Sequence, residues 1–224
     1  MDNHTFLDPL RNLPGIRAAW VERIGGLPIE GGRDEAMCLL RPHHERAVAT
    51  FADGAAWWRA EQVHGNSVAV VPGAPTHDAA DGLPVVPGVD GLVTATPGVV
   101  LSIYVADCGP IWLADPRRRA IGLLHSGKKG TETNILGEGL RVMAERFGSL
   151  PGDVVAVLGP CIRPPDYEVD FAKTIAEQAK AAGVGSFSDC GCNTASDLER
   201  FYSYRKEHGT TGRMMALLTL DTPP

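Results

Sequence analysis

The sequence predicts one mixed α+β domain, spanning residues 1–224, in which helices and sheets lie in layers. Three observations support this fold class. The length of 224 residues is typical of one domain. Short apolar runs of strand length recur along the chain, and several are apolar without interruption, as expected for strands covered on both faces. Two further segments carry apolar residues at helical spacing.

Nine segments have the composition of β-strands, because each is a short run rich in apolar and β-branched residues. Turn-forming residues separate many of them, which favours sheets over long helices. The predicted strands are residues 18–21, 47–51, 67–71, 91–94, 99–105, 111–114, 120–124, 154–158 and 214–220.

Two helices are expected in the second half of the chain. In residues 131–147 apolar side chains recur at steps of four, three and four, and Gly148 would end the helix. Residues 171–182 show a similar stripe, with Asp170 at its start as an N-cap and Gly183 at its end. Fewer helices than strands fits a layered α+β arrangement.

Proline and glycine are concentrated in residues 72–88, which contain four prolines and three glycines. Such a segment is expected to form a long loop, and one interpretation is a mobile lid. It is too short and too internal to indicate a domain linker.

Charge and hydropathy exclude two classes of partner. The net charge is −6, and a protein that neutralises nucleic-acid phosphates normally needs clustered lysine and arginine. The N-terminus lacks the pattern of a secretory signal, and no apolar run approaches the ~18 residues of a membrane helix. We therefore expect a cytoplasmic protein that binds a small molecule, as a monomer or weak homo-oligomer, without nucleic acid or membrane.

The chain has five cysteines, Cys38, Cys108, Cys161, Cys190 and Cys192. An odd number without a signal peptide argues against a disulfide framework. The spacing of Cys190 and Cys192 is too tight for a redox Cys-x-x-Cys or a zinc knuckle. Packing in the core is the alternative role for each cysteine.

Three segments place a metal-capable side chain beside a glycine at a predicted strand end. They contain His64, Cys108 and His125. Two imidazoles and one thiolate suit zinc, and three protein ligands leave a fourth position open, as in catalytic sites. The three residues are far apart in sequence, however, and no zinc-finger spacing links them. The alternative is that both histidines bond to backbone at turns while Cys108 packs in the core.

The same segments resemble the motifs of the laccase-domain family. Residues 62–65 (Gln-Val-His-Gly), 106–110 (Ala-Asp-Cys-Gly-Pro) and 125–130 (His-Ser-Gly-Lys-Lys-Gly) resemble its Gln-Val-His-Gly, Ala-Asp-Cys-x-Pro and His-Ala-Gly-Trp-Arg-Gly elements. Residues 158–169 and 201–214 resemble its Gly-Pro-x-Ile, Tyr-Glu-Val, Phe-Ser-Tyr-Arg and Thr-Gly-Arg-Met elements. The five matches occur in order and cover most of the chain.

The resemblance implies a mixed α/β sandwich, related in outline to bacterial toxin deamidases with a Cys-His pair. It implies one zinc ion bound by His64, Cys108 and His125. Family members are known as purine nucleoside phosphorylases acting on adenosine, inosine, guanosine and methylthioadenosine, with some adenosine deaminase activity. An older label, multicopper polyphenol oxidase, makes copper the alternative metal. Some bacterial members limit misincorporation of serine into peptidoglycan precursors.

One motif departs from the family pattern, since Lys128 and Lys129 stand where the family has Trp-Arg. The change removes an indole that could stack on a base and a guanidinium that could bind phosphate in a fixed geometry. Lysines still attract phosphate, with less fixed geometry. We expect Lys128, Lys129, Arg205 and Arg213 as candidate phosphate-binding residues; surface charge is the alternative for each.

Two further residues are candidates because they adjoin the proposed ligands. Asp107, next to Cys108, could orient a histidine ligand, which would make it part of the catalytic group, or it could cap a turn. Gln62 could contact substrate or bond to loop backbone.

Four other functions are consistent with parts of the pattern. Residues 122–128 match Gly-x4-Gly-Lys, but Lys129 stands where a P-loop needs Ser or Thr. A copper-dependent polyphenol oxidase would use the same two histidines and cysteine. A Cys-His hydrolase would use Cys108 as nucleophile and His125 as base. The last alternative is a metal-stabilised binding protein without enzymatic activity.

Overall fold

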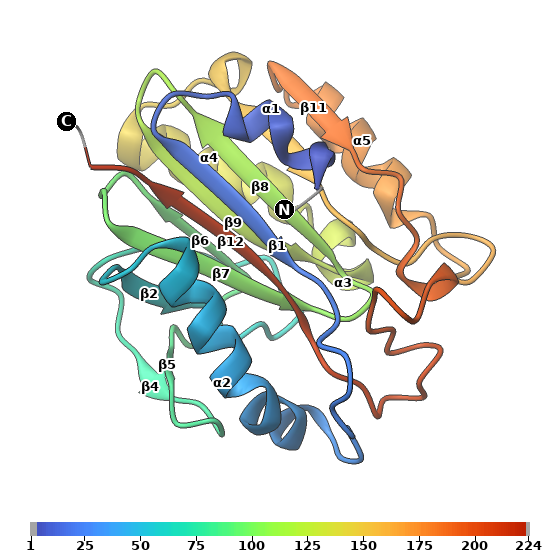
Figure 1. The fold of residues 1–224 in the computed structure, drawn as a ribbon. Helices are drawn as coiled ribbons and strands as arrows, with labels where there is room; N and C mark the ends of the chain where they lie inside the picture. The colour runs from blue at the N-terminus through green and yellow to red at the C-terminus, as the bar shows by residue number, and fades with distance from the viewer. Residues whose placement is uncertain (1–3, 223–224) are drawn as a thin grey trace.

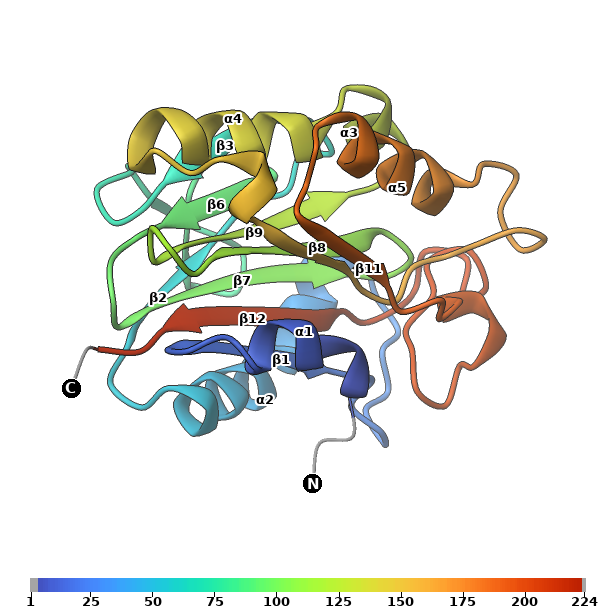
Figure 2. The ribbon, with the colours of Figure 1, turned by 90° about the horizontal axis from the view of Figure 1, so that it is seen from above.

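The structure, a computed structural model, describes residues 4–222. Two β-sheets pack face to face, and helices cover both outer faces (Figure 1). Figure 2 shows these layers edge-on, with α3, α4 and α5 on one side and α2 on the other. The arrangement confirms the predicted layered α/β sandwich.

The first sheet has four strands in the order β1-β12-β7-β2. β12 is antiparallel to both of its neighbours, whereas β2 runs parallel to β7. Its two central strands are buried along their whole length, as the apolar runs predicted. The bounds are β1 Ile16–Val21, β12 Met214–Leu220, β7 Val99–Val105 and β2 Ala56–Arg59.

The second sheet has six strands in the order β11-β10-β8-β9-β6-β3. Its outermost pairs, β10 with β11 and β3 with β6, are parallel, and the others are antiparallel. The bounds are β11 Ser186–Asp189, β10 Val155–Leu158, β8 Gly109–Asp115, β9 Ala120–Ser126, β6 Gly91–Thr94 and β3 Val68–Val70.

The core between the sheets centres on Trp112 of β8, which is fully buried. Its ring meets that of Trp20 in β1 edge to face, with centroids 6.1 Å apart. The indole nitrogen of Trp112 donates a hydrogen bond of 3.0 Å to the carbonyl of Leu217 in β12. This bond joins the two sheets directly and satisfies a polar group that would be costly to bury alone.

The helices cover the outer faces through two further apolar clusters. α4 and α5 pack on the six-stranded sheet, α2 packs on the four-stranded sheet, and α1 lies against β1 and β10. No helix within residues 4–222 is long and apolar enough to cross a membrane. The bounds are α1 Asp8–Arg11, α2 Arg33–Phe51, α3 Lys128–Glu132, α4 Ile135–Phe147 and α5 Phe171–Ala181, with 3-10 turns at Thr5–Leu7, Pro151–Asp153 and Thr194–Ser196.

The predicted helix at residues 131–147 is divided into α3 and α4. Asn134 separates them with a left-handed φ of 57°, a conformation that asparagine tolerates better than most residues. Its side-chain oxygen caps α4 by accepting from the backbone N–H of Gly137 at 3.0 Å. Gly148 ends α4 as predicted. In α5, Asp170 is the N-cap and accepts from Lys173 N, also as predicted.

The prediction of a strand at residues 47–51 is wrong, because this run is the last turn and a half of α2. The buried side chains of α2 recur at helical spacing, but one of them is His44 rather than an apolar residue. Pro42, inside the helix, further obscured the pattern, since proline normally marks a helix end. Strands β2 and β11 were not predicted either; each has only four residues, and neither is fully buried.

The segment 72–88 carries a short hairpin of β4 (His77–Asp78) and β5 (Pro84–Val85). Asp81, between these strands, forms a two-pronged ion pair with Arg59, with hydrogen bonds of 2.7 and 3.1 Å. Both side chains are at most 4% exposed. Because an unpaired buried charge would be strongly unfavourable, this pair fixes the segment against β2 and does not support a mobile lid.

His44 is the one buried histidine in α2, and its ring lies 5.0 Å from that of Tyr104. Its pKa is lowered from 6.5 to about 4, mainly by burial, and the nearby charge of Arg59 acts in the same direction. In the unfolded chain His44 takes up a proton near pH 6.5, whereas in the folded protein it stays neutral down to about pH 4. The free energy of unfolding must fall as the pH drops through this window.

We predict that His44→Phe removes this pH dependence. The 2.5-unit difference between 6.5 and about 4 corresponds to a loss on the order of 3 kcal/mol in the native protein between pH 7 and pH 4. Urea unfolding at a series of pH values measures it. The difference in unfolding free energy between variant and native protein should shift in favour of the variant as the pH falls; a difference independent of pH would contradict the assignment.

Candidate metal centre

The candidate metal centre lies at one end of the sandwich, beside two of the connections through which the chain crosses between the sheets. His64 is in the connection from β2 to β3, and Cys108 is in the turn from β7 to β8; both connections join the four-stranded to the six-stranded sheet. His125 is near the end of β9. The sheet crossovers therefore bring together three segments that are far apart in sequence.

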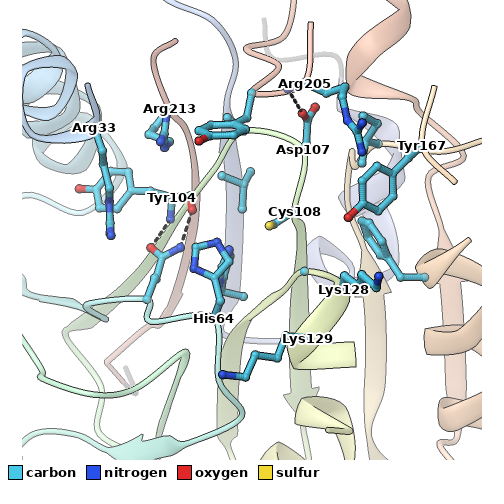
Figure 3. A pocket seen from close by; sticks show the side chains of 18 of the residues that line it. Arg33, His64, Tyr104, Asp107, Cys108, Lys128, Lys129, Tyr167, Arg205 and Arg213 are labelled. Atoms are coloured by element: carbon cyan, nitrogen blue, oxygen red, sulfur yellow. Dashed lines mark hydrogen bonds between the residues drawn. The ribbon is translucent and has the colours of Figure 1, made fainter. Parts of the chain in front are cut away.

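The ligand atoms of His64, Cys108 and His125 all lie within 4.8 Å of one another. Figure 3 shows the side chains of His64 and Cys108 turned toward each other across the pocket. A side chain at Gly127 would place its Cβ 2.7 Å from the Cys108 sulfur, so only glycine fits beside the thiol. The convergence predicted for these three residues is thus present, and it is the only such group of His, Cys, Asp or Glu in residues 4–222.

Asp90, which directly precedes β6, holds both histidines. One carboxylate oxygen accepts from Nδ1 of His125 at 2.8 Å and from the backbone N–H of His64 at 2.8 Å. The other oxygen accepts from the backbone N–H of Gly65 at 2.7 Å. The bond to Nδ1 leaves Nε2 of His125 available as a metal ligand, as in the carboxylate–histidine–zinc arrangement.

The protonation of Cys108 and His125 also suits a metal ligand set. Burial would raise the pKa of the Cys108 thiol, but the charge of His125 and hydrogen bonds with His125 and His64 lower it to about 6. Burial would lower the pKa of His125, but Cys108 and Asp90 raise it to about 9. Without metal the pair is therefore a thiolate beside an imidazolium near neutral pH. A metal cation would replace the imidazolium proton and keep the thiolate.

The three residues line a cavity of about 850 Å³. One wall is apolar and aromatic, formed by Ile162, Tyr167 and Phe171. The rings of Tyr167 and Phe171 meet edge to face, with centroids 6.1 Å apart. The cavity is large enough for a nucleoside-sized ligand.

The candidate phosphate-binding residues all line this cavity. Lys128 and Lys129 begin α3 and are exposed. Arg205 lies over the Tyr167 ring and bonds to Glu168 at 2.8 Å. Arg213 is partly buried and donates to the backbone carbonyls of Thr211 and Gly212.

None of the hydrogen bonds of the Asp107 carboxylate is to a histidine. Its carboxylate accepts from the hydroxyl groups of Thr194 and Ser203 and from the backbone N–H of Arg205. It thereby fixes the loop before β12 against the β7–β8 turn (Figure 3). The histidine-orienting role considered for Asp107 belongs to Asp90.

Gln62 adopts the backbone-bonding role. Its amide donates to the carbonyl of Tyr104 at 2.5 Å and accepts from the Tyr104 N–H at 2.8 Å. This pair of hydrogen bonds to β7 fixes the segment that carries His64, while the Gln62 side chain still lines the cavity.

Asp90 and Arg33 also belong to the cavity region but were not predicted. Arg33, the first residue of α2, lines the cavity. Its position depends on α2, a helix that the sequence pattern did not predict. A signal for Asp90 was present, because it is a carboxylate directly before a buried strand, but its partners are 25 to 35 residues away along the chain.

Comparison with known proteins identifies the family. The family described as multi-copper polyphenol oxidoreductase laccase matches residues 33–173 and 169–221. A purine nucleoside phosphorylase of Corynebacterium glutamicum is 31% identical over 96% of this chain and 97% of its own length. One of Deinococcus radiodurans is 37% identical, over 58% of this chain and 61% of its own length. The chain therefore belongs to this family.

Solved structures show the same fold. YlmD from Geobacillus stearothermophilus has a TM-score of 0.77 at 26% identity, covering 94% of this chain and 93% of that one. A Bacillus licheniformis hypothetical protein, YfiH, has a TM-score of 0.76 at 23% identity, covering 92% and 93%. The family and the His-Cys-His group agree in pointing to a metal-binding protein.

We predict that Asp90→Asn weakens metal binding by roughly 10–100-fold, because the amide cannot accept from all three donors as a carboxylate does. Competition with a chromogenic chelator measures the affinity for zinc. Asp53→Asn, an exposed aspartate in the loop after α2, is the matched control. If circular dichroism shows that both variants are folded and their zinc affinities are equal, Asp90 has no role in metal binding.

In the metal-free protein, we expect iodoacetamide to alkylate Cys108 with a rate that rises around pH 6, since the thiolate forms there. Added zinc at pH 7 should suppress the reaction. Mass spectrometry locates the adduct, and Cys108→Ser identifies its contribution. A rate that rises only near the ordinary thiol pKa of about 8.5 would contradict the thiolate–imidazolium pair.

Proposed function

We propose that the protein is a zinc-dependent purine nucleoside phosphorylase. The observation that carries the proposal is the convergence of His64, Cys108 and His125 in a cavity that has an aromatic wall and a cationic lining. The names of the relatives from Corynebacterium glutamicum and Deinococcus radiodurans support the same activity.

The donor set fits zinc better than copper. Two imidazoles and one thiolate supply three of four tetrahedral positions and leave the fourth open to the cavity. Bound there, zinc would polarise a ligand oxygen or lower the pKa of a bound water. A blue-copper site would normally add a weak axial methionine, and no methionine is among the described residues that line the cavity. A multicopper oxidase would also need further metal sites, for which residues 4–222 offer no second ligand group.

Phosphorolysis breaks the bond between C1′ of the ribose and N9 of the purine, and it forms a bond between C1′ and a phosphate oxygen. The products are ribose 1-phosphate and the free base, which takes up a proton. The transition state has positive charge on the ribose and negative charge on the departing base. The enzyme must therefore hold phosphate by cations and orient the base.

The cavity offers groups for both tasks. The aromatic surface of Tyr167 and Phe171 suits the purine, although position 128 carries no indole. Lys128, Lys129, Arg205 and Arg213 supply cationic charge around the cavity. Gln62 and Asp107 position the backbone that carries the ligands, through their bonds to Tyr104 and to the loop before β12.

A Cys-His hydrolase is the second candidate, and Asp90 is the observation that favours it. In the absence of metal, Cys108 would be the nucleophile and His125, hydrogen-bonded to it, the base. Asp90 would orient the base through its hydrogen bond to His125. Zinc would occupy the thiolate and prevent its attack. Activity with and without zinc therefore distinguishes the two functions.

We expect about one zinc per chain by elemental analysis, and phosphate-dependent release of base from adenosine or inosine. His125→Ala should lose both the metal and the activity, because the variant lacks one of three ligands. Parallel measurement of inosine formed from adenosine detects deamination. Zinc without base release in the native protein would reject the phosphorylase, and hydrolysis by only the zinc-free protein would favour the Cys-His hydrolase.

A further inference from the structure

The cavity has a charge opposite to that of the whole protein. The chain carries a net charge of −6, yet five arginine and lysine side chains and only two carboxylates line the cavity. One of these carboxylates, Asp107, is fully engaged by hydrogen bonds. An excess of cations around a cavity favours an anionic ligand and raises its local concentration. The lining cations are Arg33, Lys128, Lys129, Arg205 and Arg213.

Four of these cations form two pairs on opposite sides of His64 and Cys108, and Lys129 lies apart from both pairs (Figure 3). Lys128 and Arg205 lie with Tyr167 on one side. There the Glu168 carboxylate forms an ion pair with Arg205 at 2.8 Å, and the charge of Lys128 also helps to lower the pKa of Glu168. The guanidinium carbon of Arg205 also lies over the Tyr167 ring, 4.8 Å from its centroid. The charge on this side is thus partly neutralised within the protein.

The other side holds Arg33 and Arg213, and neither forms an ion pair with a carboxylate of residues 4–222. Arg33 donates from Nη2 to the carbonyl of Glu61 at 2.7 Å. Arg213 donates from Nη1 to the carbonyls of Thr211 and Gly212 at 2.9 and 2.8 Å. These bonds to backbone hold the guanidinium groups in place and leave their remaining N–H donors without a protein anion.

The two guanidinium groups also affect each other. Burial lowers the pKa of Arg213, and the charge of Arg33 lowers it further. Two like charges that share a cavity, and that have no ion-paired carboxylate of their own, destabilise each other, and a bound dianion would relieve that repulsion. A phosphate group matches the planar donor geometry of arginine and can bond to two guanidinium groups at once.

We propose that Arg33 and Arg213 form the phosphate-binding site of this cavity, with Arg33 as a specificity residue at the start of α2. The assignment rests on the proposed phosphorylase function for its role in turnover. A nucleoside whose base lies on Tyr167 and Phe171 would then extend past the metal centre toward the arginine pair. Lys128 and Arg205 belong to the base side and contribute less to phosphate binding.

The test is calorimetric titration of zinc-loaded protein with inorganic phosphate and, separately, with inosine. Arg33→Ala removes the donors of an exposed side chain, so folding is not at risk. Arg46→Ala, an exposed arginine on the same helix outside the cavity, is the matched control. We expect Arg33→Ala to weaken phosphate binding roughly tenfold or more, Arg33→Lys to weaken it less, and Arg46→Ala to leave it unchanged. Inosine affinity should be the same in all of them.

The assignment would be overturned if the affinities for phosphate and for inosine 5′-monophosphate were both unchanged in Arg33→Ala, or if phosphate and inosine binding were lost equally. A titration with inosine 5′-monophosphate distinguishes the source of the phosphate group. If only this compound loses affinity in Arg33→Ala, the arginine pair binds a phosphate ester of the substrate rather than free phosphate. Native protein that binds phosphate through Arg33 but releases no base would reject the phosphorylase function while the phosphate site stands.

Discussion

The carboxylate of Asp90 accepts hydrogen bonds from three donors on two separate segments, and the candidate metal centre depends on them. The side chain of Asp90 is fully buried, so its charge requires these donors. The same bonds fix the ring of His125 and the backbone of His64. The hydrogen bonds that stabilise the buried carboxylate are therefore the same bonds that set the positions of the two histidine ligands.

The sandwich supplies the frame for these hydrogen bonds. Two of the connections between the sheets, from β2 to β3 and from β7 to β8, meet at the end that holds the candidate metal centre, and each carries one candidate ligand. Backbone strain is concentrated there as well. Six described residues other than glycine have positive φ, and four of them line the cavity: Gln62, His64, Asp107 and His208. Such conformations persist where surrounding bonds impose them, and they are common at functional sites.

The sequence marked His64, Cys108 and His125 as candidate ligands because each lies near a glycine at the end of a predicted strand. Burial on both faces likewise made β7, β8, β9 and β12 recognisable as apolar runs. Family motifs added the expectation of zinc at His64, Cys108 and His125, which the local pattern alone left open.

Other features depend on contacts between distant residues and left little local signal. Helix α2 escaped prediction because His44 interrupts its buried face and Pro42 lies within it, and Arg33 was missed with it. Asp90 and Asp107 are both aspartates beside a strand, and only the folded chain shows that Asp90 reaches a histidine whereas Asp107 reaches the loop before β12. Pairing of Arg205 with Glu168 similarly decides which cations remain available to a ligand.

X-ray absorption at the zinc edge tests the central claim most directly, because it reports the atoms bound to the metal in the purified protein. Coordination by His64, Cys108 and His125 predicts one sulfur at about 2.3 Å and two nitrogens at about 2.0–2.1 Å, with one further light atom. Loss of the sulfur shell in Cys108→Ser would identify its source. A shell of nitrogen and oxygen alone, or one with two or more sulfurs, would contradict this account of the site.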